Sequence, residues 1–198
     1  MKLSVIIPVF NEAETIFELV ERVRRVPLEK ELVLVDDSSF DGSGEILARL
    51  GADADTTVLS HPVNRGKGVA IATALHAASG DVVVIQDADL DYDPNDFMKL
   101  IEPIEKGAAQ VVYGVRDLSS QRAIMRAGNR FLTWLTGVLF GVRLHDMETC
   151  YKMMTRSVYE LLSLECRRFD VEAEITAKIL RAGFSIHERP IAYNARYD

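Results

Sequence analysis

The sequence predicts an α/β protein in which a mostly parallel β-sheet is flanked by helices on both faces. Apolar segments of strand length alternate with segments of helical periodicity through the first 114 residues. The strand-like segments are hydrophobic at consecutive positions, which is typical of strands buried on both faces of a parallel sheet. With 198 residues, 48% of them hydrophobic, the chain is long enough for one domain with a sizeable core.

The first strand is predicted over residues 2–10, and a helix follows it. Asn11 and Glu14 have the spacing of a capping box, with Asn11 as the expected N-cap. Apolar residues then recur at helical spacing, which predicts that one face of this helix is buried. These residues are Ala13, Ile16, Phe17, Val20 and Val23.

Four more strands and three more helices continue the alternation. The strands are predicted over residues 31–37, 56–62, 81–86 and 109–114, and the helices over residues 45–51, 69–79 and 93–105. The last helix opens at Asp93 and Pro94, because proline is compatible with a first helical turn.

The chain from Val115 onward is different. It is helical and basic up to Arg143, and then continues with a strand over 148–154, a helix over 171–183 and a strand over 185–193. We predict one domain over residues 1–198, in which residues 115–198 elaborate on residues 1–114.

The composition excludes several classes of protein. A net charge of −7 argues against nucleic acid as a partner, because such binding depends on cationic contacts to phosphate. Cys150 and Cys166 form no disulfide framework, which favours a cytoplasmic protein with reduced thiols. Met1 leads directly into a strand, so no signal peptide is expected. The longest apolar stretch, residues 131–142, is shorter than the roughly 20 residues of a membrane-spanning helix. The glycine-rich motifs of dehydrogenases and P-loop NTPases are absent.

Polar side chains follow three of the predicted strands, at the point where each strand ends. They are Asn11 and Glu12, with Pro8 at the end of the first strand, then Asp36 and Asp37, then Asp87 and Asp89. Ligands of open α/β sheets bind beyond the carboxyl ends of the strands. We therefore expect these residues to lie together around one site.

The strand predicted over residues 81–86 is followed by alternating aspartates, Asp87, Asp89, Asp91 and Asp93. Alternate residues of an extended segment point to the same side, so Asp87 and Asp89 are expected to project together. Two adjacent carboxylates repel unless a cation neutralises them, and Mg²⁺ or Mn²⁺ prefers such oxygen ligands. We predict a metal at Asp87 and Asp89, with Asp91 as a third ligand, that holds a diphosphate. A solvated loop is the alternative, and Asp93 is interpreted as a helix cap.

Five motifs in order give the chain a resemblance to a known family. "SVIIPVFNEAETI", "LVLVDDSSFDGS", "NRGKGVAIATAL", "DVVVIQDADLDYDP" and "DMETCYKMM" resemble the family 2 glycosyltransferases. Within that family the chain looks most similar to the polyprenyl-phosphate hexosyltransferases, the dolichol-phosphate mannose synthase group. The resemblance implies the GT-A fold, a Rossmann-like sheet, with nucleotide-sugar binding in residues 1–114 and acceptor binding in residues 115–198. It also implies inverting transfer of a hexose from GDP-mannose or UDP-glucose to a polyprenyl or dolichyl phosphate.

The resemblance assigns roles to individual positions. The base and ribose of the donor would contact Pro8, Phe10, Glu12, Val35 and Asp37, and Lys67 would lie near the nucleotide sugar. Asp87, Ala88 and Asp89 match the Asp-Ala-Asp that binds the diphosphate through a metal. Arg116 matches an arginine that faces the phosphates, and Asp146 lies near the position of a catalytic carboxylate, so that Asp89, Asp146 and Arg116 are the expected catalytic residues. Many relatives have glutamine at the position of Asp91, and they usually continue past Arg196 with a loop over the donor.

The acceptor side is expected in the basic segment. Between Val115 and Leu144 there are five arginines and one acid, Asp117; the arginines are Arg116, Arg122, Arg126, Arg130 and Arg143. Those at 122, 126 and 130 share one helix face, and an aromatic and aliphatic stretch follows them. This pattern suits an anionic membrane surface and a lipid phosphate, which Arg116, Arg122, Arg126 and Arg196 would bind. A core-packing helix and a homodimer interface are the alternatives.

The acceptor decides the chemistry that the site needs. A polyprenyl phosphate is already anionic and needs no strong base, whereas a hydroxyl acceptor needs a carboxylate such as Asp146. Two other functions fit the same motifs: transfer to a soluble or polysaccharide acceptor, and a non-catalytic subunit that binds nucleotide sugars. With a lipid acceptor we expect a cytoplasmic protein, bound peripherally at the inner face of the membrane.

Overall fold

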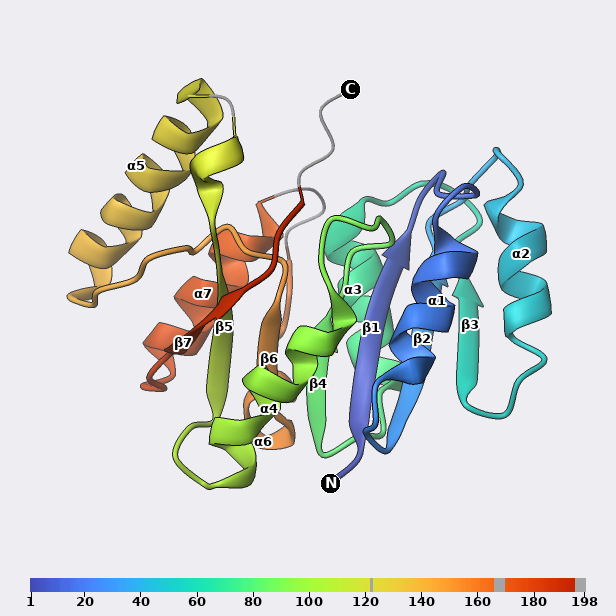
Figure 1. Ribbon diagram of the computed structural model, residues 1–198, viewed down its shortest axis with the longest axis horizontal. Helices are drawn as coiled ribbons and strands as arrows, with labels where there is room; N and C mark the ends of the chain where they lie inside the picture. The colour runs from blue at the N-terminus through green and yellow to red at the C-terminus, as the bar shows by residue number, and fades with distance from the viewer. Residues whose placement is uncertain (122, 166–169, 195–198) are drawn as a thin grey trace.

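The computed structural model describes residues 1–121, 123–165 and 170–194, and it confirms the predicted fold class. Its centre is a seven-stranded sheet of order β3-β2-β1-β4-β6-β5-β7 (Figure 1). Only β6 runs antiparallel to its neighbours β4 and β5 among the paired strands of the described chain. The strands are β1 Leu3–Val9, β2 Lys30–Asp36, β3 Thr56–Ser60, β4 Val82–Ile85, β5 Val111–Arg116, β6 Lys152–Thr155 and β7 His187–Ile191.

Helices cover both faces of this sheet. In Figure 1, α1 and α4 lie in front of the strands, and α3 and α7 lie behind them. The helices are α1 Ile16–Arg25, α2 Ser43–Leu50, α3 Lys67–Ala77, α4 Phe97–Glu105, α5 Ala123–Phe140, α6 Arg156–Tyr159 and α7 Val171–Arg181, with short 3-10 turns at Pro94–Asp96 and Leu118–Ser120. Asp93 caps the first of these turns by accepting from the Asn95 N–H, as predicted.

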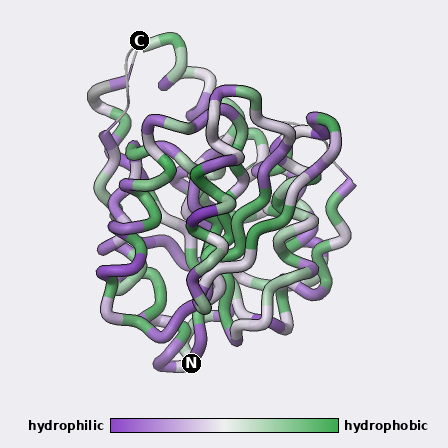
Figure 2. Tube along the Cα trace, turned by 90° about the vertical axis from the view of Figure 1, so that its right-hand side faces the viewer, coloured by the Kyte–Doolittle hydropathy of each residue, from purple (hydrophilic) through white to green (hydrophobic). Residues whose placement is uncertain are grey.

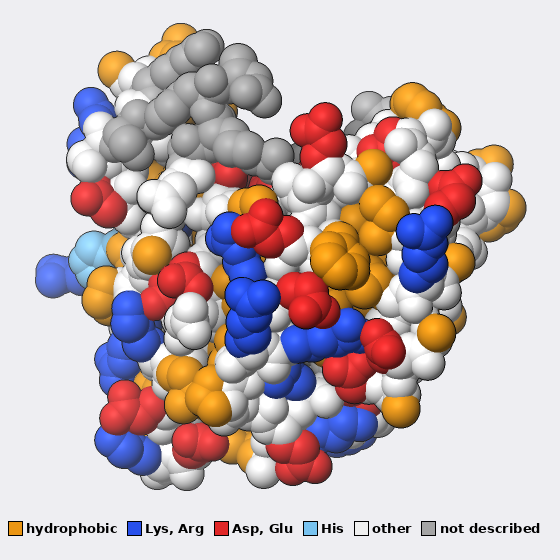
Figure 3. All heavy atoms as spheres, turned by 45° about the vertical axis from the view of Figure 1, so that its right-hand side comes forward, with side chains coloured by type: hydrophobic (Ala, Val, Ile, Leu, Met, Phe, Trp, Pro, Cys, Tyr) orange, Lys and Arg blue, Asp and Glu red, His pale blue; other side chains and the backbone are white. Residues whose placement is uncertain are grey.

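The core is built on the central strands. All four residues of β4 are buried, and Val5 of β1 pairs with Leu32 of β2 on one side and Val84 of β4 on the other. Figure 2 shows the hydrophobic residues concentrated along these strands. On the face seen in Figure 3, by contrast, acidic and basic side chains are interspersed, as on an ordinary solvated surface. The hydrophobic runs of the sequence are therefore the parallel strands, as expected.

The predicted start of the first helix is wrong. Asn11 has a positive φ of 55°, its side chain accepts from the Phe40 N–H, and α1 begins five residues later at Ile16. The reason is that residues 39–43 bind the N–H groups of this loop: Ser39 Oγ accepts from Asn11 and Ser43 Oγ from Glu12. These tertiary bonds hold the chain in a loop at the end of β1 where the local sequence favours a helix.

The longest helix of the C-terminal third, α5, is exposed. Within α5, all of whose backbone is described, only Thr133 is buried, so the interpretation as a core-packing helix is wrong. Large hydrophobic side chains including Phe131, Trp134 and Leu139 are exposed on it. Nowhere in the described ranges is a helix both long and apolar enough to cross a bilayer.

Candidate functional site

A cavity of about 910 Å³ lies at the carboxyl ends of β1, β2 and β4. Most of the residues predicted to bind the donor line it. Their positions are Pro8, Phe10, Glu12, Asp37, Lys67, Asp87, Ala88 and Asp89. The topology explains this gathering, because parallel strands bring their carboxyl ends to one rim. Val35 is the exception, since its side chain is fully buried within β2 and lies outside the lining.

Phe10 gives the cavity an apolar side. Its ring is 42% exposed and meets Phe40 edge-on, with ring centroids 6.0 Å apart. An exposed aromatic ring at the rim of a cavity that also carries charged groups is suited to stacking with a flat heterocycle. The role of Phe10 toward a nucleotide base stays a prediction.

Asp37 shapes another loop that lines the cavity, residues 63–66. Its carboxylate is buried and accepts from the N–H groups of Arg65 (2.9 Å) and Gly66 (2.6 Å), and its Oδ1 lies 2.7 Å from His61 Nδ1. Gly66 has φ 92° and ψ 159°, a conformation that glycine adopts far more readily than other residues. In this structure Asp37 therefore holds the segment that presents Lys67, and its predicted contact with the ribose stays untested.

Lys67 places a cation between two carboxylates inside the cavity. Its Nζ lies 2.8 Å from Asp87 Oδ1 and 2.8 Å from Glu172 Oε1. Burial opposes ionisation of Asp87, but the charge and hydrogen bond of Lys67 outweigh burial and keep the pKa of Asp87 below its usual value. The two carboxylates likewise hold the pKa of Lys67 well above its ordinary value, despite burial. Asp87 and Lys67 are therefore both ionised at neutral pH.

Asp89 and Asp91 lie in different surroundings. Asp89 lines the main cavity and also a second hollow of about 630 Å³, which Asp91 lines as well. The Asp91 N–H donates to Asp89 Oδ1 at 3.1 Å. Asp91 lies outside the lining of the main cavity, so the cavity itself receives two of the predicted metal-binding carboxylates, Asp87 and Asp89.

These two carboxylates suit a hard cation that also binds the ligand. In the part of the chain that the structure describes, no three of His, Cys, Asp and Glu converge into a complete metal cluster. Mg²⁺ commonly takes one or two carboxylates from the protein and its other ligands from phosphates and water. Asp87 and Asp89 match that partial set of ligands.

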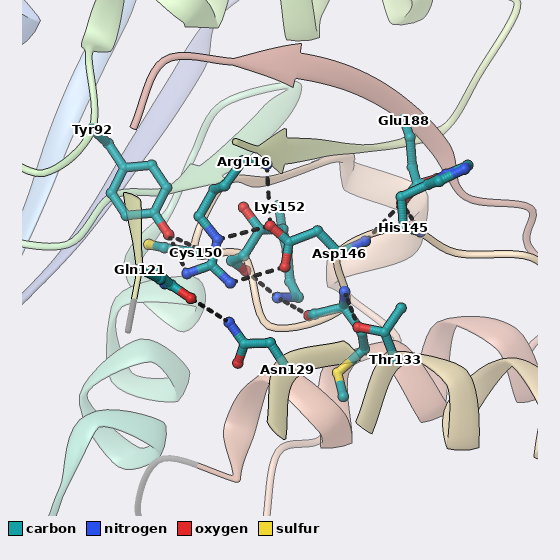
Figure 4. Close-up of polar contacts among 12 residues, drawn as sticks. Tyr92, Arg116, Gln121, Asn129, Thr133, His145, Asp146, Cys150, Lys152 and Glu188 are labelled. Atoms are coloured by element: carbon teal, nitrogen blue, oxygen red, sulfur yellow. Dashed lines mark hydrogen bonds and ion pairs between the residues drawn. The ribbon is translucent and has the colours of Figure 1, made fainter. Parts of the chain in front are cut away.

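Arg116 and Asp146 form a second buried centre (Figure 4). The guanidinium binds the carboxylate in two places, with Nε 2.7 Å from Oδ2 and Nη2 2.8 Å from Oδ1. Tyr92 Oη lies 3.3 Å from Nη1, and the Tyr193 ring lies under the guanidinium. Burial would lower the pKa of Arg116, but its bonds to Asp146 raise it above the ordinary value. Both residues are predicted site residues, yet they bind each other and neither lines the main cavity.

The segment around Asp146 is tied to its surroundings from several sides (Figure 4). The N–H of His145 donates to Glu188 of β7, and that of Met147 donates to Thr133 of α5. Lys152 is fully buried and donates to the carbonyls of Met147 and Thr149. Its burial lowers the pKa of Lys152 to about 8, against the opposing charge of Glu172.

The predicted basic face is only partly described. Arg126 lies in the first half of α5 and donates to the Ser119 carbonyl at 3.2 Å, and Arg130 lies on the same helix. Arg122 and Arg196 lie outside the described residues, as does Cys166. The binding of an acceptor phosphate by these arginines stays a prediction.

Sequence reasoning missed two residues of the site, Glu172 and Lys152. Glu172 lies in the first turn of α7, where an acidic residue is ordinary and gives no sign of its contact with Lys67. Lys152 did carry a signal, since it is the one charged residue in "CYKMM" and a charged residue in a buried strand needs partners.

Comparison with known proteins bears on both the fold and the family. Solved structures of glucosyl-3-phosphoglycerate synthase from Mycobacterium tuberculosis superpose with a TM-score of 0.76, at 24% identity over 100% of this chain and 73% of that one. A structure of the same enzyme with Mn²⁺ and UDP-glucose gives a TM-score of 0.76 at 23% identity, covering 99% of this chain and 72% of that one. At this identity the likeness shows the fold alone, and that fold is the expected GT-A arrangement.

Curated relatives carry a higher identity. An undecaprenyl-phosphate 4-deoxy-4-formamido-L-arabinose transferase of Pseudomonas fluorescens (strain SBW25) is 31% identical over 194 residues, which is 95% of this chain and 55% of the relative. Its namesake in Pseudomonas aeruginosa (strain LESB58) is 33% identical over 190 residues, 93% of this chain and 54% of the relative. The chain thus spans about half the length of these relatives. The profile of glycosyl transferase family 2 matches residues 4–162, and together these findings show that the chain belongs to that family.

Proposed function

We propose that this chain transfers a sugar from a nucleotide sugar to a polyprenyl phosphate at a membrane surface. The observation that carries the proposal is the cavity, which joins an exposed aromatic residue, Phe10, to a pair of carboxylates, Asp87 and Asp89. An aromatic surface suits the base of a nucleotide, and carboxylates with a divalent cation suit its diphosphate. The names of the relatives, undecaprenyl-phosphate sugar transferases, support the lipid acceptor.

The sugar is left broader than the sequence-based expectation. The resemblance implies a hexose, carried by GDP-mannose or UDP-glucose. The relatives are named for a derivative of arabinose, which is a pentose. The proposal therefore covers a hexose or a pentose, and both belong in the assay.

A divalent cation, Mg²⁺ or Mn²⁺, is part of the proposal. Asp87 and Asp89 would hold it, and Asp91 would act from the adjoining hollow. When bound, such an ion stabilises the negative charge of the departing diphosphate. The residues of the chain supply the rest: Phe10 and Pro8 orient the donor, and Lys67 places a fixed positive charge inside the cavity.

The state of Asp146 favours an anionic acceptor. Both of its carboxylate oxygens bind the buried Arg116, and Asp146 lies outside the lining of the cavity, so it is poorly placed to take a proton from a hydroxyl acceptor there. A phosphate acceptor needs no such base, because its oxygen is already ionised near neutral pH. With that acceptor, the chain contributes mainly positioning and charge stabilisation to an inverting displacement.

The test is sugar transfer with a defined acceptor. The chain is incubated with MnCl₂, undecaprenyl phosphate in detergent micelles, and labelled UDP-glucose, GDP-mannose or a UDP-linked pentose, and organic extracts are counted. We expect label in the lipid phase with one donor and at least a hundredfold loss in Asp89→Ala, a typical cost of removing a main stabilising group. Asp93→Ala, which alters a neighbouring helix cap outside the cavity, is the matched control. Label that appears only in water-soluble products, or full transfer by Asp89→Ala, contradicts the proposal.

A further inference from the structure

We infer that Glu172 is a positioning residue of the donor site, which takes the ammonium of Lys67 and so frees Asp87 for the divalent cation. This inference rests on the proposed function and adds a residue from the C-terminal third to the donor site. Glu172 comes from α7, whereas the other donor residues come from the first 89 residues of the chain.

One ammonium is shared between two carboxylates. Lys67 Nζ lies 2.8 Å from Asp87 Oδ1 and 2.8 Å from Glu172 Oε1, and the exposed fractions of the three side chains are 16%, 24% and 11%. The hydrogen bond to Glu172 has ordinary geometry at 2.8 Å. Only Asp87 of these two acids belongs to the Asp-Ala-Asp segment, so Lys67 links that segment to α7.

The shared ammonium competes with a metal ion. A divalent cation at Asp87 repels the ammonium that already neutralises this carboxylate, and in a partly buried site this repulsion is only weakly screened. The ammonium needs a second anion to remain charged when the cation arrives. Glu172 is that anion, already within hydrogen-bonding distance.

Removing the charge of Glu172 should therefore strengthen the competition. In Glu172→Gln, Asp87 is the one remaining carboxylate in contact with Lys67 among the ion pairs of the described residues. The ammonium then binds Asp87 more firmly, and the cation binds less tightly. If Lys67 is replaced by Met, the competitor is gone, and Glu172 should no longer matter.

The test measures Mn²⁺ binding directly. Free Mn²⁺ is followed by electron paramagnetic resonance while MnCl₂ is added to the chain with UDP, for the native protein, Glu172→Gln, Lys67→Met and the double variant. We expect the Kd for Mn²⁺ to rise about tenfold in Glu172→Gln, to fall in Lys67→Met, and to be equal within about twofold in Lys67→Met and the double variant. Glu174→Gln, an equal charge change in the same helical turn, should bind like the native protein within about twofold.

The outcomes separate this inference from the proposed function. Three results would overturn the role of Glu172. The first is an unchanged Kd for Mn²⁺ in Glu172→Gln, and the second is that Glu172→Gln weakens Mn²⁺ binding as much in the Lys67→Met protein as in the native protein. The third is weaker Mn²⁺ binding by Lys67→Met than by the native protein. The comparison of Lys67→Met with the native protein does not depend on the folding of Glu172→Gln. Circular dichroism checks that each variant is folded. Absence of Mn²⁺ binding by the native chain with UDP and with GDP would instead contradict the proposed function.

Discussion

The carboxylate of Asp37 shows how one buried charge can set the shape of a binding loop. It accepts from two consecutive backbone N–H groups, of Arg65 and Gly66, and binds the ring of His61. These bonds fix the residue before Lys67 in a conformation that suits glycine. The position of the cavity's lysine is thus decided by an acid that follows a different strand.

Replacing this acid should destabilise the protein. In Asp37→Asn one acceptor oxygen becomes an NH₂ group, which faces backbone N–H donors and cannot accept from them. We therefore expect the free energy of unfolding to fall by about 2 kcal/mol. Urea unfolding followed by circular dichroism measures the change. Glu45→Gln, which removes an exposed acidic charge in α2, should change it by less than about 0.5 kcal/mol. Equal stability of Asp37→Asn and the native protein would show that the loop does not depend on this charge.

Lys152 should give the stability of the protein an unusual dependence on alkaline pH. Burial lowers its pKa to about 8, against an ordinary value of 10.5. Between these two values the unfolded chain binds the proton more tightly than the folded one, so this group makes stability rise with pH. Below pH 8 the cost of burying the charge is fully present.

The measurement compares the native protein with Lys152→Met. We expect the difference in unfolding free energy, native minus variant, to increase by roughly 1 kcal/mol for each pH unit from pH 8 to 10. Urea unfolding of both proteins at four pH values between 8 and 10 measures this difference. Lys99→Met, at an exposed lysine of α4, is the control. A flat difference for Lys152→Met would mean that this lysine titrates normally.

At the scale of elements, Glu31 joins β2 to the start of β1 and to the turn before β4. It binds Lys2, accepts from Ser4 Oγ at 2.6 Å, and accepts from the N–H and Oγ of Ser79. Burial opposes its ionisation, but these bonds lower its pKa from 4.5 to about 2. A lowered carboxyl pKa stabilises the fold above the unfolded value of 4.5, and that stabilisation is lost as the pH falls toward 2.

Glu31→Gln should therefore cost most at neutral pH. Allowing for partial exposure, we expect a loss of about 2 kcal/mol at pH 7 that shrinks steadily between pH 4.5 and 2. Urea unfolding across that range tests it, with the exposed Glu29→Gln as control. A loss that does not vary with pH would assign the effect to packing.

The helix α5 is an element without a covering partner along most of its length within the described chain. Phe131, Trp134 and Val138 lie at helical spacing and are 57%, 61% and 60% exposed. Arg126 and Arg130 precede them on the same helix. Apolar side chains beside cations suit the surface of an anionic bilayer.

Removing these side chains should release the protein from membranes. We expect the native chain to sediment with phosphatidylglycerol liposomes, and Phe131→Ser with Trp134→Ser to lower the bound fraction at least tenfold, because about 2–3 kcal/mol per buried side chain is lost. Phe17→Ser, at an exposed phenylalanine of α1, is the control. A concentration-dependent dimer that the α5 variant abolishes, with no binding to liposomes, would favour the homodimer interface instead.

At the scale of the whole molecule, hydrophobic pattern alone predicts most of the fold. The run Val82–Ile85 is apolar at every position because β4 is covered on both faces, and the same holds for most of β1 and β2. The convergence of Pro8, Asp37 and Asp87 also follows from sequence, because parallel strands end at one rim. Local pattern suffices wherever the fold repeats a strand and a helix.

The sequence does not predict contacts between distant segments. Lys67 and Glu172 are 105 positions apart, and no periodicity relates them. Arg116 and Asp146 were each expected at the site, but their mutual ion pair depends on the antiparallel β6, which brings the loop before it against β5. The prediction of Asn11 as a helix cap was wrong for the same reason, because hydrogen bonds from residues 39–43 override its local preference. Local propensity is a weak guide where tertiary bonds compete with it.

The cavity's construction predicts that ligand binding stabilises the entire fold. Its lining comes from β1, α3 and the loops that follow β1, β2, β3 and β4, all strands of one sheet, so unfolding should destroy the site. A nucleotide sugar with Mn²⁺ at a hundred times its Kd should then raise the free energy of unfolding by about 2.7 kcal/mol. Thermal unfolding with UDP-glucose or GDP-mannose, each with and without MnCl₂, measures this. Asp89→Ala should lose the part of the shift that depends on Mn²⁺, whereas Phe10→Ala should lose the part that remains without metal. A shift of equal size in Asp89→Ala would place the metal elsewhere, because a ligand stabilises only the state that binds it.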